Sequence, residues 1–190
     1  LDGSEPTEES PLYSGPFDVV PAAGETVTIR ARAFKDGWRP SDEATQVALT
    51  RRWTIGDSLG APEQTFVTGG RAAWTRSRYG YNGCEAMRSG KIVDGASCWL
   101  KTTVPSSGVV SFWWKTSCEQ TDDVESPWDH IEFSVDGKVV AWIDGESEWE
   151  QVEYNISGDG EHVLLWTYVK DASDSRGQDC AWVSRFAWVC

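Results

Sequence analysis

Residues 108–119 (GVVSFWWKTSCE) and 160–188 (GEHVLLWTYVKDASDSRGQDCAWVSRFAW) decide the fold of this chain. Both read as apolar, aromatic strands joined to polar, cysteine-bearing loops, and together they hold five of the 12 tryptophans. Residues 109–116 are apolar on both faces, which is typical of a central strand covered on each side. In a β protein, a tryptophan either fills the core between two sheets or offers a flat face to a ligand. The functional question is therefore which tryptophans pack in the core and which are available to a ligand.

Alternating polar and apolar residues dominate much of the remaining sequence, and helical periodicity is almost absent. Residues 130–143 alternate on both sides of Asp136-Gly137, which is the strongest hairpin signal in the chain. Residues 151–156 and 162–169 are predicted to form a second strand pair around a Gly-Asp-Gly turn. Many short strands at this spacing favour an all-β fold built from sandwiches.

The composition changes near residues 50–62, where the alternation stops and Gly56, Gly60 and Pro62 follow one another. Residues 1–50 hold no cysteine and one tryptophan, whereas the rest of the chain holds the other 11. We therefore expect a first module at residues 1–50, a linker at 51–62 and a β-sandwich at 63–190.

The net charge of −13 argues against nucleic acid and anionic membrane surfaces as partners, because both attract basic patches. No run of 18 apolar residues is present, so membrane insertion is not expected. The sequence also begins without the features of a secretory signal. We expect a monomeric internal piece of a longer, multidomain chain.

A first set of motifs lies near the start of the sequence: residues 1–7 (LDGSEPT), 12–16 (LYSGP) and 27–38 (VTIRARAFKDGW), followed by Pro40-Ser41. With these motifs, residues 1–49 resemble the chitobiase/β-hexosaminidase C-terminal module. The resemblance implies a fibronectin type III-like β-sandwich that acts as a spacer in secreted glycan-degrading proteins. We expect the module to be truncated, without the strands that would precede Leu1, and we assign it no site.

A second set of motifs follows: residues 66–70 (FVTGG) with Trp74, 88–92 (RSGKI), 111–115 (SFWWK), Asp136-Gly137, Gly145-Glu146 with Trp149, and the stretch from Trp166 to Trp182. Residues from about 58 to 190 thereby resemble a jelly-roll repeat of bacterial surface and secreted proteins, related in plan to MAM and laminin-G-like sandwiches. The resemblance implies an antiparallel jelly roll and an extracellular or cell-surface location. One departure is that Ser184-Arg185 follow Trp182-Val183, where the pattern usually carries Asp. This departure weakens the case for a calcium site like that of related jelly rolls.

Tryptophans within the apolar strands are expected in the core, where each buries on the order of 200 Å². They are Trp113, Trp114, Trp166 and Trp182. Trp149 is expected to pack at the start of its strand.

The polar loop at residues 119–129 (EQTDDVESPWD) differs, because Trp128 stands there among carboxylates. Sugar sites combine an aromatic face with acids that accept hydrogen bonds from hydroxyls. Loops on rigid sandwiches are also where binding residues gather. We therefore predict glycan contacts from Trp128, Asp123, Asp129, Tyr79 and Tyr81. The alternative for Trp128 is a loop anchor that folds back onto the sandwich.

Residues 171–179 (DASDSRGQD) are rich in oxygen ligands, of which calcium takes six to eight. One interpretation is a structural calcium held by Asp171, Asp174, Asp179 and Glu119. The other is a solvated turn, because the spacing of an EF-hand is missing and Arg176 interrupts the acids.

Five cysteines are present without any CxxC pair, which argues against structural zinc. We prefer disulfides to buried free thiols. Cys118 ends one strand and Cys180 begins another, so antiparallel pairing of these strands favours a Cys118–Cys180 bridge worth ~4 kcal/mol. Cys84–Cys98 is the second expected bridge, which leaves Cys190 unpaired or bonded to another part of the protein.

Catalysis has little support, because neither of the two histidines has a serine or cysteine partner at motif spacing. We expect a non-catalytic extracellular module that binds carbohydrate, with a glycan or a surface protein as partner. The first alternative is a structural or adhesive repeat of a bacterial surface protein. The second is a lectin-like glycosidase that uses the acids at residues 146–150 (ESEWE), Glu148 among them.

Overall fold

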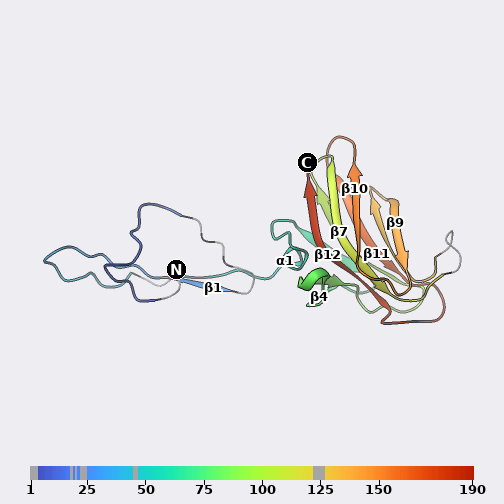
Figure 1. Ribbon diagram of the computed structural model, residues 1–190, viewed down its shortest axis with the longest axis horizontal. Coiled ribbons are helices and arrows are strands. Elements are labelled where there is room, and N and C mark those ends of the chain that lie inside the picture. The colour runs from blue at the N-terminus through green and yellow to red at the C-terminus, as the bar shows by residue number, and fades with distance from the viewer. Residues whose placement is uncertain (1–3, 18, 20, 22–24, 45–46, 122–126) are drawn as a thin grey trace. The chain divides into compact units, whose positions relative to one another are not determined.

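The computed structural model describes residues 4–17, 19, 21, 25–44, 47–121 and 127–190. The chain divides into two compact units, Leu1–Trp53 and Thr54–Cys190. In Figure 1 the first unit is coloured from blue to cyan and the second from cyan to red. In the described part of the chain, no helix has the length and apolarity to cross a membrane.

The first unit contains one two-stranded antiparallel sheet, in which β1 (Thr26–Ile29) pairs with β2 (Val47–Thr50). Beyond β1, an ion pair of 2.7 Å joins Arg30 Nε to Glu43 Oε1. Large apolar side chains of this unit stay exposed, including Trp38 at 70% and Leu12 at 92%. A two-stranded sheet offers too little surface to cover them.

The segment expected as a linker, residues 51–62, contains the helix α1 (Ile55–Leu59). Thr54 and Asp57 form a capping box at its start, and Gly60 ends it with a φ of 76°. Leu59 is fully buried, so α1 packs as part of the second unit. The alternation typical of strands is interrupted in this segment by α1.

The second unit consists of two five-stranded sheets in which every neighbouring pair of strands is antiparallel. The first sheet has the order β10 (Glu150–Ile156), β7 (Gly108–Ser117), β12 (Cys180–Val189), β5 (Ala86–Arg88) and β4 (Thr75–Ser77). The second has the order β3 (Phe66–Gly70), β6 (Ser97–Val104), β11 (His162–Val169), β8 (His130–Val135) and β9 (Lys138–Asp144). The expected antiparallel β-sandwich is confirmed.

Aromatic rings from both sheets form the core of the sandwich. Phe112 of β7 contacts Trp166 of β11 at a ring-centroid distance of 5.1 Å and Phe133 of β8 at 4.8 Å. Phe186 of β12 meets Phe66 of β3 edge-to-face at 5.2 Å. Such edge-to-face pairs add to the stabilisation from burying the rings.

The hairpin predicted around Asp136-Gly137 is confirmed by the pairing of β8 with β9. Asp136 and Gly137 both have positive φ, as two-residue hairpin turns require. The second predicted strand pair is wrong, because β10 pairs with β7 and β11 pairs with β6 and β8. The chain crosses from one sheet to the other between β10 and β11.

The strand β7 alternates between the core and the outer face of its sheet. Phe112 and Trp114 are buried in the core, whereas Trp113 is half-buried on the opposite face. The expectation of a core position is therefore confirmed for Trp114 and Trp166 and wrong for Trp113. Trp182 is buried too, but on the outer face, where it packs with Trp149.

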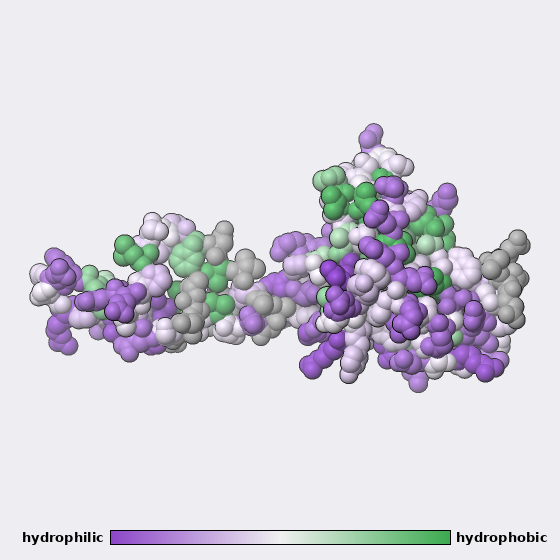
Figure 2. Space-filling model, in the orientation of Figure 1, coloured by the Kyte–Doolittle hydropathy of each residue, from purple (hydrophilic) through white to green (hydrophobic). Residues whose placement is uncertain are grey.

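The visible surface of the second unit is largely hydrophilic, as Figure 2 shows. Hydrophobic side chains gather toward the end of the sandwich where β12 finishes. The last residue of β12, Val189, is 66% exposed.

Candidate functional site

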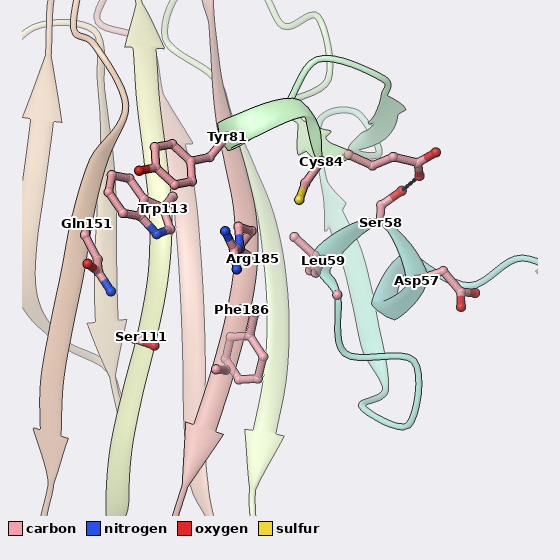
Figure 3. Close-up of a pocket in the computed structure, with 13 residues that line it drawn as sticks. Asp57, Ser58, Leu59, Tyr81, Cys84, Ser111, Trp113, Gln151, Arg185 and Phe186 are labelled. Atoms are coloured by element: carbon pink, nitrogen blue, oxygen red, sulfur yellow. Dashed lines mark hydrogen bonds between the residues drawn. The ribbon is translucent and has the colours of Figure 1, made fainter.

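An open groove of about 790 Å³ lies on the outer face of the first sheet. Its floor comes from β7, β10 and β12, and its walls come from α1 and the loop between β4 and β5 (Figure 3). The lining residues that carry aromatic rings or polar groups include Tyr81, Trp113, Ser111, Gln151, Arg185 and Glu85. All of them belong to the second unit.

The rings of Tyr81 and Trp113 stack in parallel in this groove, with centroids 3.5 Å apart and planes 7° apart. Figure 3 shows Tyr81 reaching from the 3₁₀ turn at Tyr81–Gly83 toward Trp113 on β7. Trp113 is in register with Ser184 of β12 and Gln151 of β10, so all three lie on the outer face. The pair forms an aromatic platform next to polar side chains.

Backbone geometry fixes the turn that carries Tyr81. Cys84 N–H donates to the Tyr81 carbonyl at 3.1 Å, and Gly80 N–H donates to the Cys84 carbonyl at 2.8 Å. A Cβ at Gly80 would lie 2.3 Å from the Glu85 carbonyl oxygen, so only glycine fits there. The buried Ser184 hydroxyl accepts from Tyr81 N–H and donates to the Glu85 carbonyl at 2.6 Å, which ties the turn to β12.

Glu85 holds two walls of the groove together. Its carboxylate accepts a hydrogen bond of 2.7 Å from Ser58 of α1 and one of 2.8 Å from Arg76 Nε of β4. The hydrogen bond from Arg76 is the largest cause that lowers the pKa of Glu85 below its ordinary value, and the Ser58 hydroxyl acts in the same direction. Glu85 is thus an ionised structural link.

Arg185 enters the groove from an irregularity in β12. The register with β7 shifts between Ser184 and Ala187, and Arg185 adopts a φ of 51° inside this bulge. A positive φ is rare for a residue with a Cβ, and bulges re-aim side chains next to sites. Figure 3 shows Arg185 between Trp113 and Leu59. Sequence reasoning did not include Arg185, although the unusual Ser184-Arg185 pair marked the position.

The predicted glycan contacts are only partly brought together. Tyr81 lines the groove, whereas Tyr79, 87% exposed, and Trp128, 38% exposed, do not. His130 Nδ1 lies 2.7 Å from the Trp128 carbonyl oxygen, a contact that restrains the loop. Asp129 is fully buried and therefore closed to ligands, and Asp123 lies outside the described residues.

One predicted calcium ligand, Asp179, contacts a lysine, together with two aspartates that were not predicted as calcium ligands. The Lys170 ammonium lies 2.7 Å from Asp179 Oδ2, 3.4 Å from Asp129 Oδ2 and 3.1 Å from Asp94 Oδ1. Asp171 Oδ1 accepts the Ser173 N–H, so Asp171 stabilises its own turn. No group of three or more His, Cys, Asp or Glu side chains in the described ranges has a metal-binding arrangement.

In the described part of the chain, the carboxylates of the other three predicted ligands, Asp171, Asp174 and Glu119, form no ion pair with Lys170. Asp174 is exposed with a φ of 51°, and Glu119 is buried at 8% exposure. Burial raises the pKa of Asp129, within the cluster, to about 6. The calcium site stays a prediction, and the ammonium of Lys170 supplies to Asp129 and Asp179 the positive charge that a calcium ion would bring.

All five cysteines are free thiols in the structure, so neither expected disulfide is formed. Strands β7 and β12 do pair antiparallel at this end, with Cys180 opposite Ser117. The buried thiols have separate partners: Cys118 Sγ donates to the Asp129 carbonyl, and Cys180 Sγ accepts from Arg88 Nε. Burial raises the pKa of Cys118 to about 12.

The acids considered for a glycosidase do not form a catalytic pair in the groove. Glu146 Oε1 accepts a hydrogen bond of 2.7 Å from the Ser117 hydroxyl. Glu148 lies two residues before β10, and Glu150 is the first residue of β10. None of the three lines the groove.

The model of one protein family, the chitobiase/beta-hexosaminidase C-terminal domain, matches residues 1–46. The predicted resemblance of the first module is thereby confirmed over residues 1–46. No curated protein matches the chain.

Among solved structures, the secreted serine protease VesC from Vibrio cholerae matches with a TM-score of 0.51 and 12% identity. The match covers 88% of this chain but 34% of the protease, so the chain spans about one third of its length. At this identity the likeness shows the fold alone.

Two carbohydrate-binding modules also match, with lower TM-scores. The family 35 module from Clostridium thermocellum has a TM-score of 0.37 and 14% identity, covering 66% of this chain and 92% of the module. The CBM36-1 domain of a multidomain xylanase from the hindgut metagenome of Trinervitermes trinervoides has a TM-score of 0.36 and 14% identity. The match covers 65% of this chain and 93% of that domain.

Proposed function

We propose that the second unit is a non-catalytic module that binds a glycan in the groove formed by α1, the β4–β5 loop and the first sheet. The stacked Tyr81–Trp113 pair carries this proposal. The apolar CH faces of a sugar ring pack against aromatic rings, and its hydroxyls need nearby donors and acceptors. Gln151 and Ser111 supply these on the same face of the sheet.

The polar part of the groove suits recognition more than hydrolysis. A glycosidase needs two carboxyl groups across the scissile bond, and its general acid needs a raised pKa. The two carboxylates in the groove belong to Asp57 and Glu85. Asp57 caps α1, and the pKa of Glu85 is lowered by Arg76, so neither suits the role of general acid.

The proposed setting is an extracellular protein that acts on glycans. Its support is the match of residues 1–46 to a domain named for chitobiase and β-hexosaminidase. The relation of the second unit to jelly-roll repeats of bacterial surface proteins belongs to the same proposal. In this setting, the module would hold its parent protein at a polysaccharide.

A glycan array probed with the 190-residue chain tests the proposal, with the Trp113→Ala and Trp128→Ala variants measured beside it. Binding that Trp113→Ala abolishes and Trp128→Ala leaves intact would support the groove. The reverse pattern would place the site in the loop at residues 119–129. Thermal unfolding of each variant separates lost binding from lost folding.

Two outcomes would replace the proposal. Absence of binding to plant, mucin and microbial glycans would favour the structural or adhesive repeat. Turnover of any glycan, lost in Glu148→Gln, would favour the glycosidase.

A further inference from the structure

We propose that the groove selects a saccharide that carries a carboxylate, and that Arg185 binds this carboxylate. The inference rests on the proposed glycan-binding function and names the class of sugar. A uronic acid residue within a polysaccharide is the simplest ligand of this kind.

The backbone of Arg185 is held in an uncommon conformation that projects the side chain into the groove. Its φ of 51° falls within the bulge between Ser184 and Ala187. For a residue with a Cβ this conformation costs free energy, and such strain is found at binding sites more often than elsewhere. A glycine would fit this backbone with less strain, so an arginine at the position suggests a role for its side chain.

The guanidinium of Arg185 is the one charge of the groove without an internal partner. Among the described residues, no hydrogen bond or ion pair involves it. By contrast, Glu85 pairs with Arg76, and Asp57 Oδ2 accepts from Thr54 N–H at 2.7 Å. Both groove carboxylates therefore have partners within the protein, whereas the guanidinium of Arg185 is left to attract an anion locally.

The chemistry of arginine matches a carboxylate closely. Its planar guanidinium donates two parallel hydrogen bonds to the two oxygens of a carboxylate. The net charge of the chain is −13, so an anionic ligand is repelled by the rest of the molecule and depends on a local cation. Loss of Arg185 should therefore affect an acidic glycan far more than a neutral one.

The neighbouring residues complete a sugar site around that contact. Tyr81 and Trp113 offer aromatic surface on one side of Arg185, with Gln151 beyond them on β10 (Figure 3). A pyranose ring over the aromatic pair, with its carboxylate turned toward Arg185, uses both features at once.

The test compares acidic polysaccharides with their neutral counterparts in affinity gel electrophoresis of the 190-residue chain. The probes are polygalacturonate, hyaluronan and sialylated mucin, each beside a carboxyl-reduced or methyl-esterified preparation. We expect at least one acidic probe to bind about tenfold or more tightly than its neutral form, with an affinity that falls as salt is added. Equal affinity for acidic and neutral forms, or binding to neutral glycans alone, overturns this inference and leaves the glycan-binding function standing. Absence of binding to every acidic and neutral probe overturns both.

Variants assign the preference to Arg185. Arg185→Gln should remove the acidic preference, while Arg176→Gln, in an exposed loop outside the groove, should keep it. Arg185→Gly should lose the preference while its melting temperature stays equal to or above that of the parent chain, because glycine accepts the positive φ. An acidic preference that survives in both Arg185 variants overturns the assignment.

Discussion

The ammonium of Lys170 lies 2.7 Å from the carboxylate of Asp179, with the lysine side chain only 1% exposed. Asp129, which is fully buried, lies 3.4 Å from the same ammonium. Asp129 Oδ1 also accepts the Asp171 N–H at 3.0 Å, so this cluster joins the end of β11 to the polar loops on either side. The acidic loops are therefore organised around a cation that the chain itself supplies.

Replacing the buried lysine should destabilise the second unit strongly. In Lys170→Met, Asp129 and Asp179 lose their counter-charge, and leaving a buried charge unpaired costs about 3 kcal/mol or more. Urea unfolding monitored by tryptophan fluorescence gives the free energy of unfolding. The matched control is Lys91→Met at an exposed position, and an equal loss in both variants would contradict the account.

Calcium should have little effect on the stability of the parent chain, because Lys170 occupies the space between the acids. Differential scanning calorimetry with calcium or with a chelator should give the same melting temperature. A clear rise in melting temperature with calcium would support the metal site predicted from the acidic loop, since a ligand that binds only the folded state stabilises it.

The contact between His162 and Asp136 predicts a pH-dependent contribution to stability. His162 Nδ1 lies 2.7 Å from Asp136 Oδ2, and this contact raises the pKa of His162 above 6.5 and lowers the pKa of Asp136 below 3.8. The stabilisation of the fold by His162 is complete below pH 6.5 and is lost as the pH rises through its folded-state pKa. The contribution of the aspartate is complete above pH 3.8 and is lost as the pH falls through its lowered pKa.

His162→Gln should therefore lose more stability near pH 5 than near pH 9, measured by urea unfolding at both values. The matched control is His130→Gln, at a histidine that forms no close carboxylate hydrogen bond in the described structure. A loss that is the same at both pH values would show that the ion pair contributes nothing.

Thiol reactivity should separate the cysteines into two groups. Cys84 and Cys190 are exposed and should react with iodoacetamide in the native protein. Cys98, Cys118 and Cys180 are buried, and burial raises the pKa of Cys98 to about 11 and that of Cys118 to about 12, so they should react only after unfolding. Peptide mapping without reductant measures this. Cys118 and Cys180 that stay unmodified in denaturant would instead establish the disulfide predicted from the sequence.

Local patterns were enough to predict much of the sandwich. The alternation in β8 and β9 and the Asp136-Gly137 turn lie within one short segment, so the hairpin follows from neighbouring residues alone. The partners of β10 and β11 could not be predicted in the same way. A Gly-Asp-Gly turn permits a hairpin, but β10 pairs with β7 and β11 with β6 and β8, which are partners distant in the sequence.

The candidate site depended on contacts between distant segments. Trp113 was predicted to be in the core because β7 is apolar on both faces, yet the outer face is apolar where Tyr81 covers it. The role of Lys170 could not be predicted from neighbouring residues alone, since two of its three carboxylate partners, Asp94 and Asp129, come from other loops. Tyr81 was among the predicted glycan contacts and lies in the groove, but nothing in the sequence placed it beside Trp113.

The affinities of Tyr81→Ala and Tyr79→Ala for the tightest-binding glycan of the array test the central claim most directly. The two tyrosines are two positions apart in one loop, but only Tyr81 stacks on Trp113 in the groove. The account predicts that isothermal titration calorimetry gives a Kd about tenfold or more weaker for Tyr81→Ala and an unchanged Kd for Tyr79→Ala. Equal affinities for the parent chain and both variants would contradict it.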